Sequence, residues 1–127
     1  MDGWVRSVRQ VEASGARVVV MEDTPWPTGD VPECIAASSS DVRECSRPTT
    51  ESIVQPVRRA KVAAAVAAAG AVPMDPTSWF CTPRVCPAII GNVLVERDDN
   101  HMTATYSRTV VPVLAERLGA TLGRPES

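Results

Sequence analysis

The only histidine of the chain, His101, lies in the stretch "VERDDNHMTATYS", three positions after Asp98. A neutral imidazole can take a proton from a hydroxyl nucleophile when a carboxylate binds its other ring nitrogen, because the carboxylate fixes the tautomer and stabilises the cation that forms. A tight turn between a strand and a helix can place residues at this spacing side by side. The spacing therefore predicts an Asp98–His101 general base that activates a serine elsewhere in the fold. The alternative is a polar turn that holds a histidine by chance.

The composition excludes several classes of function. A length of 127 residues fits one small domain, and a hydrophobic share of 44% is ordinary for a globular protein. The net charge of −2 argues against nucleic acid or an anionic membrane as the main partner. The sequence has no apolar run of the roughly 18 residues that a membrane span needs, and its first residues lack the apolar centre of a signal peptide.

Three segments have the apolar spacing of helices: residues 2–14, residues 56–69, and a last segment that begins near Thr103 as its N-cap. Gly15 and Gly70 follow the first two segments and supply stop signals. The first helix is expected to present an apolar face made of Trp4, Val5, Val8 and Val11. The last is expected to direct toward a core the side chains of Tyr106, Val110, Val113, Leu114 and Leu118.

Short apolar runs between these helices predict strands. "ARVVVMEDTP" (16–25) is a β-branched run typical of a parallel strand buried on both faces, and "AVPMD" (71–75) is a second such strand. "AIIGNVLVE" (88–96) predicts a hairpin with Gly91 and Asn92 in its turn. This alternation indicates an α/β architecture. Two parallel strands are too few for a complete sheet of that class, so the segment reads as the second half of a domain.

The four cysteines form two local pairs, Cys34 with Cys45 and Cys81 with Cys86. Both pairs lie in segments rich in Pro, Ser and Thr that are expected to be irregular loops, residues 24–48 and 76–87. In an exported protein these pairs would be two disulfides, and in the cytosol they would be buried thiols. A zinc site is the least favoured alternative, because the spacings do not match those of zinc knuckles.

Three stretches of the chain together resemble one known family. They are "VVVMEDTPWPTGDVPEC", "DPTSWFCTPRVCP" and "GNVLVERDDNHMT", in this order. They resemble the C-terminal half of an SGNH (GDSL-like) domain, of the type attached to membrane O-acyltransferases of the acyltransferase-three family. Such domains end in Asp-x-x-His, then Leu or Met, then Thr or Ser, which Asp98, His101, Met102 and Thr103 match. The resemblance is strongest over residues 16–120 and includes both cysteine pairs.

The resemblance implies a fold, a reaction and a location. The implied fold is an incomplete three-layer α/β/α (flavodoxin-like) arrangement with few parallel strands and a hairpin. Asp98 would be the acid and His101 the general base of a Ser-His-Asp triad, with Asp99 pointing to solvent. The implied reaction is O-acyl transfer or ester hydrolysis, with acetyl as the expected group, on a cell-envelope saccharide on the extracytoplasmic side of the membrane or in the periplasm. The implied partners are an acyl donor or acyl-bearing saccharide and a membrane acyltransferase domain, with no metal or other cofactor.

The chain lacks the other parts of that catalytic machinery. It has no Gly-Asp-Ser: "TGDVP" (28–32) carries valine at the serine position, and the serines of "ASSSD" (37–41) do not follow a strand. Asn92 belongs to the hairpin turn, so the oxyanion role of the family's asparagine does not transfer to it. Residues 1–127 are therefore expected to be a partial SGNH domain without the nucleophile block, inactive alone.

A non-catalytic, disulfide-stabilised module that binds a carbohydrate or a partner is the alternative function. Trp26, Trp79 and Phe80 could stack on sugar rings, although aromatic residues in disulfide-bound loops more often pack over the loop itself. A small cytosolic metal protein that uses all four cysteines is a third hypothesis. The apolar strand 17–21 would present an uncovered edge, so the isolated chain is expected to self-associate.

Overall fold

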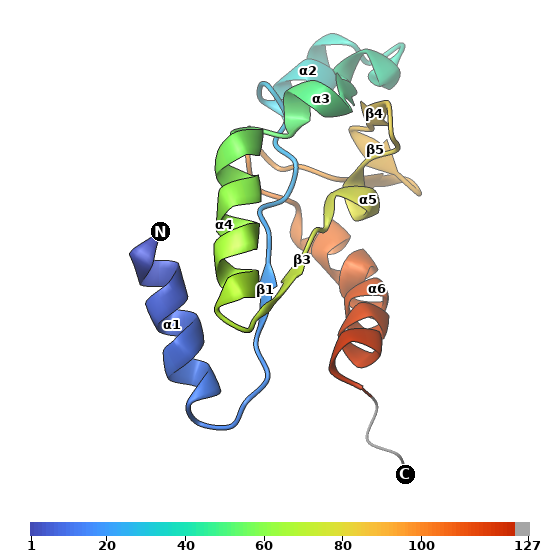
Figure 1. Cartoon of the computed structure of the whole chain (residues 1–127). Coiled ribbons are helices and arrows are strands. Elements are labelled where there is room, and N and C mark those ends of the chain that lie inside the picture. Colours follow the sequence, from blue (N-terminus) through green and yellow to red (C-terminus); the bar gives the residue numbers. More distant parts are fainter. Residues whose placement is uncertain (124–127) are drawn as a thin grey trace. The chain divides into compact units, whose positions relative to one another are not determined.

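The computed structural model describes residues 1–123, which form two compact units. The first unit comprises Met1–Asp23, Gln55–Pro76 and residues 114–123, and the second comprises Thr24–Val54 and Thr77–Val113. Helices and strands alternate along the chain (Figure 1). The helices are α1 (Asp2–Glu12), α2 (Val31–Ala37), the 3₁₀ helix η1 (Val42–Cys45), α3 (Thr49–Ser52), α4 (Pro56–Ala68), α5 (Thr77–Phe80) and α6 (Ala104–Leu122). The strands are β1 (Val19–Met21), β2 (Arg47–Pro48), β3 (Val72–Met74), β4 (Val85–Cys86), β5 (Ile89–Ile90) and β6 (Val93–Leu94).

The first unit packs α1 and α4 with a parallel pair of strands, β1 and β3 (Figure 1). Its core consists of Val8 from α1, Val66 from α4 and Ala71 just before β3. Val66 has no exposed surface, because it packs with the buried Val8 of α1, and half-buried apolar residues such as Val62 of α4 and Val20 of β1 pack against this core. The parallel pairing of the two predicted strands is thereby confirmed.

Both long helices of the first unit end as their sequence predicts. Gly70 follows α4 with a φ of +109°, a left-handed conformation that glycine adopts without steric cost. A Cβ atom at Gly70 would overlap only the carboxylate end of the flexible Glu12 side chain, which can move aside. The left-handed conformation at the end of α4 is therefore what favours glycine at this position.

Two expectations for the first unit were wrong in part. The strand predicted over residues 16–25 is only Val19–Met21, and it is not buried on both faces, since Met21 is 42% exposed. β1 also pairs with only one other strand in the described part of the chain, so one of its edges has no strand partner. The apolar face predicted for the first helix is likewise only partly buried: Val8 is buried, but Trp4 and Val11 are about half exposed.

The second unit is made of short elements joined by two disulfides. One disulfide, Cys34–Cys45, links α2 to η1, and the other, Cys81–Cys86, links the end of α5 to β4. β2 pairs with β4 in an antiparallel manner. One apolar cluster forms around Val31, Cys45 and Ala88, and a second around Phe80, Val95 and Tyr106. Crosslinks and small clusters thus replace the long packed helices of the first unit.

The segment 24–48 is not the irregular loop that was predicted, because it contains α2, η1 and β2. Asp30 is the N-cap of α2, and its carboxylate accepts a hydrogen bond of 2.8 Å from the amide of Glu33. An acid followed three positions later by glutamate is a helix-start pattern that the sequence does contain. The segment 76–87 likewise holds α5 and β4.

The hairpin and the start of the last helix are confirmed. β5 pairs with β6, and Gly91 and Asn92 between them have φ values of 55° and 61°, as a two-residue turn with two left-handed residues requires. Thr103 caps α6, since its hydroxyl oxygen accepts from the amide of Tyr106 at 3.0 Å. Tyr106 is buried and Val110 packs on the Phe80 cluster, as expected, whereas Val113 is 40% exposed, against expectation.

These observations give an α/β fold that is incomplete, as predicted. Within residues 1–123, each of the three small sheets has two strands, and β1 and β3 form the one parallel pair. The helices in residues 1–123 include none with the length and apolar content needed to cross a bilayer.

Candidate active site

The segment from Leu94 to Tyr106 is a closed loop between the hairpin and α6. Its two ends are joined by a bond from the amide of Thr103 to the carbonyl of Val95, at 2.8 Å. The hydroxyl of Thr103 also donates to the carbonyl of Leu94, at 2.6 Å. Nearer the tip, the amide of Arg97 donates to the carbonyl of His101, at 2.8 Å. The loop tip, residues 98–101, is therefore held at its base by main-chain bonds.

Asp98 and His101 are brought into direct contact at this tip. The Nδ1 atom of His101 lies 2.9 Å from Oδ2 and 3.1 Å from Oδ1 of Asp98. The same carboxylate accepts from the amides of Asn100, at 3.0 Å, and His101, at 2.7 Å. The backbone thus folds around the Asp98 carboxylate and places the ring beside it, which is the arrangement that the spacing predicted.

The hydrogen bonds to Asp98 keep its carboxyl ionised. They lower its pKa to about 2, with the amide of Asn100 as the largest cause and the amide and ring of His101 contributing further. The guanidinium of Arg97 lies 3.5 Å from the same carboxylate, on the solvent side. Asp99 is exposed, so it stands apart from this pair. A carboxylate that remains charged can orient an imidazole and stabilise its protonated form.

The other ring nitrogen of His101, Nε2, has no hydrogen-bond partner among residues 1–123. The side chain is 62% exposed, so Nε2 is accessible from outside. The serines after α2, Ser38 to Ser40, form no hydrogen bond with the ring, and Asn92 remains a turn residue of the hairpin. The described chain therefore contains a base with its carboxylate and no hydroxyl placed to use it.

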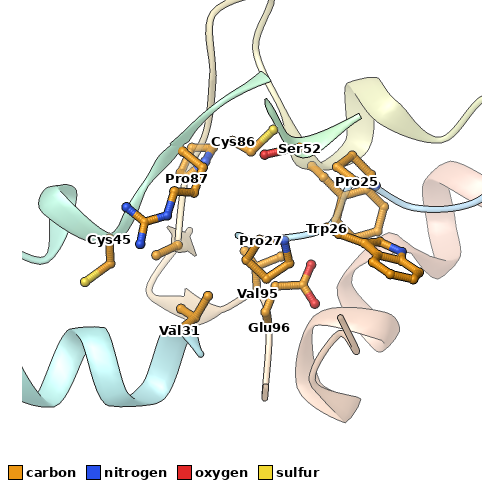
Figure 2. Close-up of a pocket in the computed structure, with 13 residues that line it drawn as sticks. Pro25, Trp26, Pro27, Val31, Cys45, Ser52, Cys86, Pro87, Val95 and Glu96 are labelled. Atoms are coloured by element: carbon orange, nitrogen blue, oxygen red, sulfur yellow. The ribbon is translucent and has the colours of Figure 1, made fainter. Parts of the chain in front are cut away.

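A buried glutamate lies beside this pair and was not anticipated from the sequence. Glu96 is only 6% exposed, although it is two positions before Asp98 in a polar stretch. It lines a cavity of about 20 Å³ together with Pro25, Trp26, Pro27 and Ser52 (Figure 2). Its pKa is raised to about 7, mainly by burial and further by the charge of Asp98, while the charge of His101 acts in the opposite direction. No pattern of residue types in the sequence predicts that Glu96 is buried.

The aromatic residues proposed for sugar stacking are largely engaged in packing. Phe80 is buried, with its ring centroid 5.4 Å from that of Tyr106. Trp79 packs on the same cluster, and its carbonyl accepts the hydroxyl of Tyr106. Trp26 lines the small cavity. Phe80 is therefore unavailable as a stacking platform, because it forms the core under the candidate site.

The cysteines and acidic groups do not form a metal site. All four cysteines are in disulfides, so none is a thiolate that could bind zinc. In the part of the chain that the structure covers, no group of three or more histidine, cysteine, aspartate or glutamate side chains could hold a metal ion.

Comparison with known families identifies the chain. Residues 2–116 match the family model described as "SGNH domain (fused to AT3 domains)". The chain belongs to this SGNH family. SGNH domains of this kind are acyl-transfer or hydrolase-type modules associated with membrane acyltransferases. Searches of curated proteins and of solved structures give no significant match.

Proposed function

We propose that this SGNH chain supplies the general base for O-acyl transfer or ester hydrolysis, with His101 as the base and Asp98 as the acid that orients it. One observation carries the proposal: the Asp98 carboxylate lies 2.9 Å from Nδ1 of His101, while Nε2 is exposed and has no partner among the described residues. An imidazole in this state accepts protons at Nε2 with the correct tautomer already fixed.

In the proposed reaction, a serine hydroxyl gives its proton to Nε2 of His101 while its oxygen attacks the carbonyl carbon of an acyl ester. The Asp98 carboxylate stabilises the imidazolium that forms. The imidazolium then returns the proton to the leaving alcohol, the ester C–O bond breaks, and an acyl-serine remains. A second hydroxyl, from water or from a saccharide, attacks the acyl-serine in the same way and releases the serine.

The serine and the oxyanion donors belong, in this proposal, to polypeptide outside these 127 residues, and the chain is one part of an SGNH domain. The absence of Gly-Asp-Ser from the sequence supports this, as does the lack of a hydroxyl bonded to His101 among residues 1–123. The proposed location is the extracytoplasmic face of the membrane. Two disulfides favour an oxidising compartment, and the family's fusion to AT3 domains favours a membrane-associated site. The proposed substrates are an acyl donor and an envelope saccharide, with acetyl as the group transferred.

The first test uses a domain completed by the polypeptide that carries a Gly-Asp-Ser nucleophile, assayed on an aryl acetate. We expect turnover in the completed domain and none from the 127-residue chain alone. His101→Ala should lower kcat by about 1,000-fold or more, and Asp98→Asn by about 100-fold or more, because each removes part of the base. Asp99→Asn is the matched control: this neighbouring carboxylate is exposed, and its loss should leave kcat unchanged.

A second readout is covalent. A fluorophosphonate, which reacts with activated serines, should label the completed domain and should label the His101→Ala form much more slowly. Turnover or labelling that survives His101→Ala would remove the proposed role of the base. A binding-only module would give neither turnover nor labelling in any form of a well-folded sample.

A further inference from the structure

The side chain of Glu96 is buried although one of its carboxyl oxygens lacks a hydrogen bond. The residue is 6% exposed, and its buried Oε2 atom has no partner among residues 1–123. A carboxyl oxygen removed from water without a replacement donor is costly, whether the group is charged or neutral. In native proteins most such atoms are bonded to the protein or to an ordered water molecule. The Glu96 carboxyl is therefore a feature that the proposed reaction does not explain.

The Glu96 carboxyl borders a small cavity of the second unit. Figure 2 shows it between Pro27 and Trp26, with Val95 beside it. The cavity has a volume of about 20 Å³. One water molecule needs about 10–15 Å³, so the cavity has room for one. A sugar ring or an acyl group does not fit, because pockets for such ligands measure roughly 300 Å³ or more.

The remaining lining of the cavity is mostly apolar but includes further polar groups. Ser52 is 1% exposed, and its hydroxyl donates to the carbonyl of Pro48 at 3.2 Å, so its oxygen can still accept a bond. Trp26 and Arg47, which also line the cavity, carry N–H donors. A buried water makes two to four hydrogen bonds, whereas a cavity with a purely apolar lining stays dry. Glu96 together with one of these three side chains meets that requirement.

The main chain of Glu96 belongs to the base of the loop whose tip is residues 98–101. A β-bridge joins Glu96 to Met102. Directly beside this bridge, the amide of Thr103 donates to the carbonyl of Val95 at 2.8 Å. A shift of the Glu96 main chain would therefore disturb the bonds that close the loop.

The side chain of Glu96 lies against residues of two other segments of the second unit, 25–27 and 47–52. These segments are themselves joined by a bond of 2.9 Å from the amide of Trp26 to the carbonyl of Ser52. A water molecule that bonds to Glu96 and to either segment would thus connect the base of the loop to both.

We propose that Glu96 binds one buried water molecule, and that this water anchors the base of the Asp98–His101 loop to the segments 25–27 and 47–52. The water donates one hydrogen to Oε2 of Glu96 and bonds to a polar group of those segments. The binding site is independent of the proposed function, because the 127-residue chain contains it without a serine or a substrate.

The first test is the magnetic relaxation dispersion of water deuterons in solutions of the 127-residue chain, whose amplitude counts the water molecules held inside the protein. Glu96→Leu, an apolar side chain of similar size, should remove the amplitude of one such water. Glu96→Gln should keep it, because an amide can bond the same water. Glu51→Leu is the matched control: it makes the same change at an exposed glutamate of the same unit and should leave the amplitude unchanged.

A second test needs no variant and so does not depend on how a variant folds. Val95 is 3% exposed and lines the cavity beside Glu96, so its methyl groups are shielded from bulk solvent. In the unmodified chain, the water resonance should give a nuclear Overhauser effect to these methyl groups. Val8, equally buried but in the core of the first unit, should give none. Absence of the effect at Val95 in a folded sample would overturn the inference.

Hydrogen exchange tests whether the water anchors the loop. The amides of Arg97 and Thr103, whose bonds close the loop, should exchange about 10-fold faster in Glu96→Leu than in the unmodified chain. In Glu96→Gln their exchange should be nearly unchanged, because the amide restores the polar contact that leucine lacks. Equal exchange of these amides in the two variants, or a deuteron amplitude that survives Glu96→Leu, would contradict the proposal.

Discussion

The two units of the chain achieve order by different means. In the first, two helices of ordinary length bury Val8, Val66 and Ala71, and no crosslink is present among its described residues. In the second, most elements have seven residues or fewer, and two disulfides together with side-chain-to-backbone bonds hold them. The candidate site belongs to the second unit.

This difference shows which interactions position side chains most accurately in a small domain. Apolar packing fixes which helices meet, but it tolerates exposed neighbours such as Trp4 and Val57. Hydrogen bonds fix the direction of a side chain, as they do for Asp98 and His101. A base that must accept a proton at one atom therefore needs hydrogen bonds that fix the direction of its side chain. Each of the following experiments acts on one unit, and hydrogen exchange reports the effect on each unit separately.

The largest effect is expected from the crosslink between α2 and η1. Replacing Cys34 and Cys45 by alanine removes a disulfide that closes a separation of 11 residues, and it should cost about 3 kcal/mol of stability in the second unit. Replacing Cys81 and Cys86, separated by five residues, should cost about 2 kcal/mol. Amides of α1 and α4 should keep their protection in both variants. An equal loss of amide protection in the first unit would contradict the view that the two units are ordered by different means.

Val66 is the matching position in the first unit. Val66→Ala leaves a cavity in a fully buried part of α4 and should cost roughly 2 kcal/mol. Val57→Ala, on the same helix but 68% exposed, should stay within about 0.5 kcal/mol. Urea denaturation followed by far-ultraviolet circular dichroism measures both. A similar cost for the two variants would mean that apolar burial does not hold this unit.

Glu96 makes the stability of the second unit depend on pH. Its folded pKa of about 7 lies above the ordinary value of 4.5, so the folded state binds more protons between these values. Stability contributed by the neutral carboxyl is therefore complete below about pH 4.5 and falls as the pH rises through 7. The free energy of unfolding of the unmodified chain should fall by on the order of 2 kcal/mol between pH 4.5 and 8, and in Glu96→Gln this fall should be absent. A wild-type melting temperature that does not fall over this range would contradict the burial of Glu96 as an acid.

Thr103 should give the smallest effect and the most local one. Thr103→Ala removes the cap of α6 and the bond to Leu94, and it should cost about 1 kcal/mol. The matched control is Thr105→Ala, an exposed threonine in the first turn of the same helix, which should be nearly neutral. The amides at the start of α6 should lose protection only in the first variant. Loss of amide protection at α4 instead would mean that the Thr103 cap does not act locally.

The features that could be predicted from sequence are those with a local physical cause. Gly91 and Asn92 adopt the left-handed conformations that their turn requires, and Thr103 caps the helix that follows. The contact between Asp98 and His101 is local too, since it depends on a carboxylate that reaches amides two and three residues ahead. In each case the residue type determines a conformation within its own turn.

The features that were missed depend on distant partners. The burial of Glu96 follows from Trp26, Pro27 and Ser52, which are far from it in sequence. The exposure of Met21 depends on which other elements cover β1, and the sequence of one strand cannot report that. α2 is a different case, because the sequence contains both the Asp30–Glu33 start signal and neighbouring prolines that are typical of loops.

The hydrogen bonds that shape the Asp98–His101 loop all connect residues between Leu94 and Tyr106. A segment with that property is portable: acid and base are transferred together, into a host whose hairpin runs into a helix and whose core accepts Glu96 and Tyr106. Protein engineers could graft the segment beside a chosen hydroxyl on another scaffold, and its own hydrogen bonds would orient the imidazole ring.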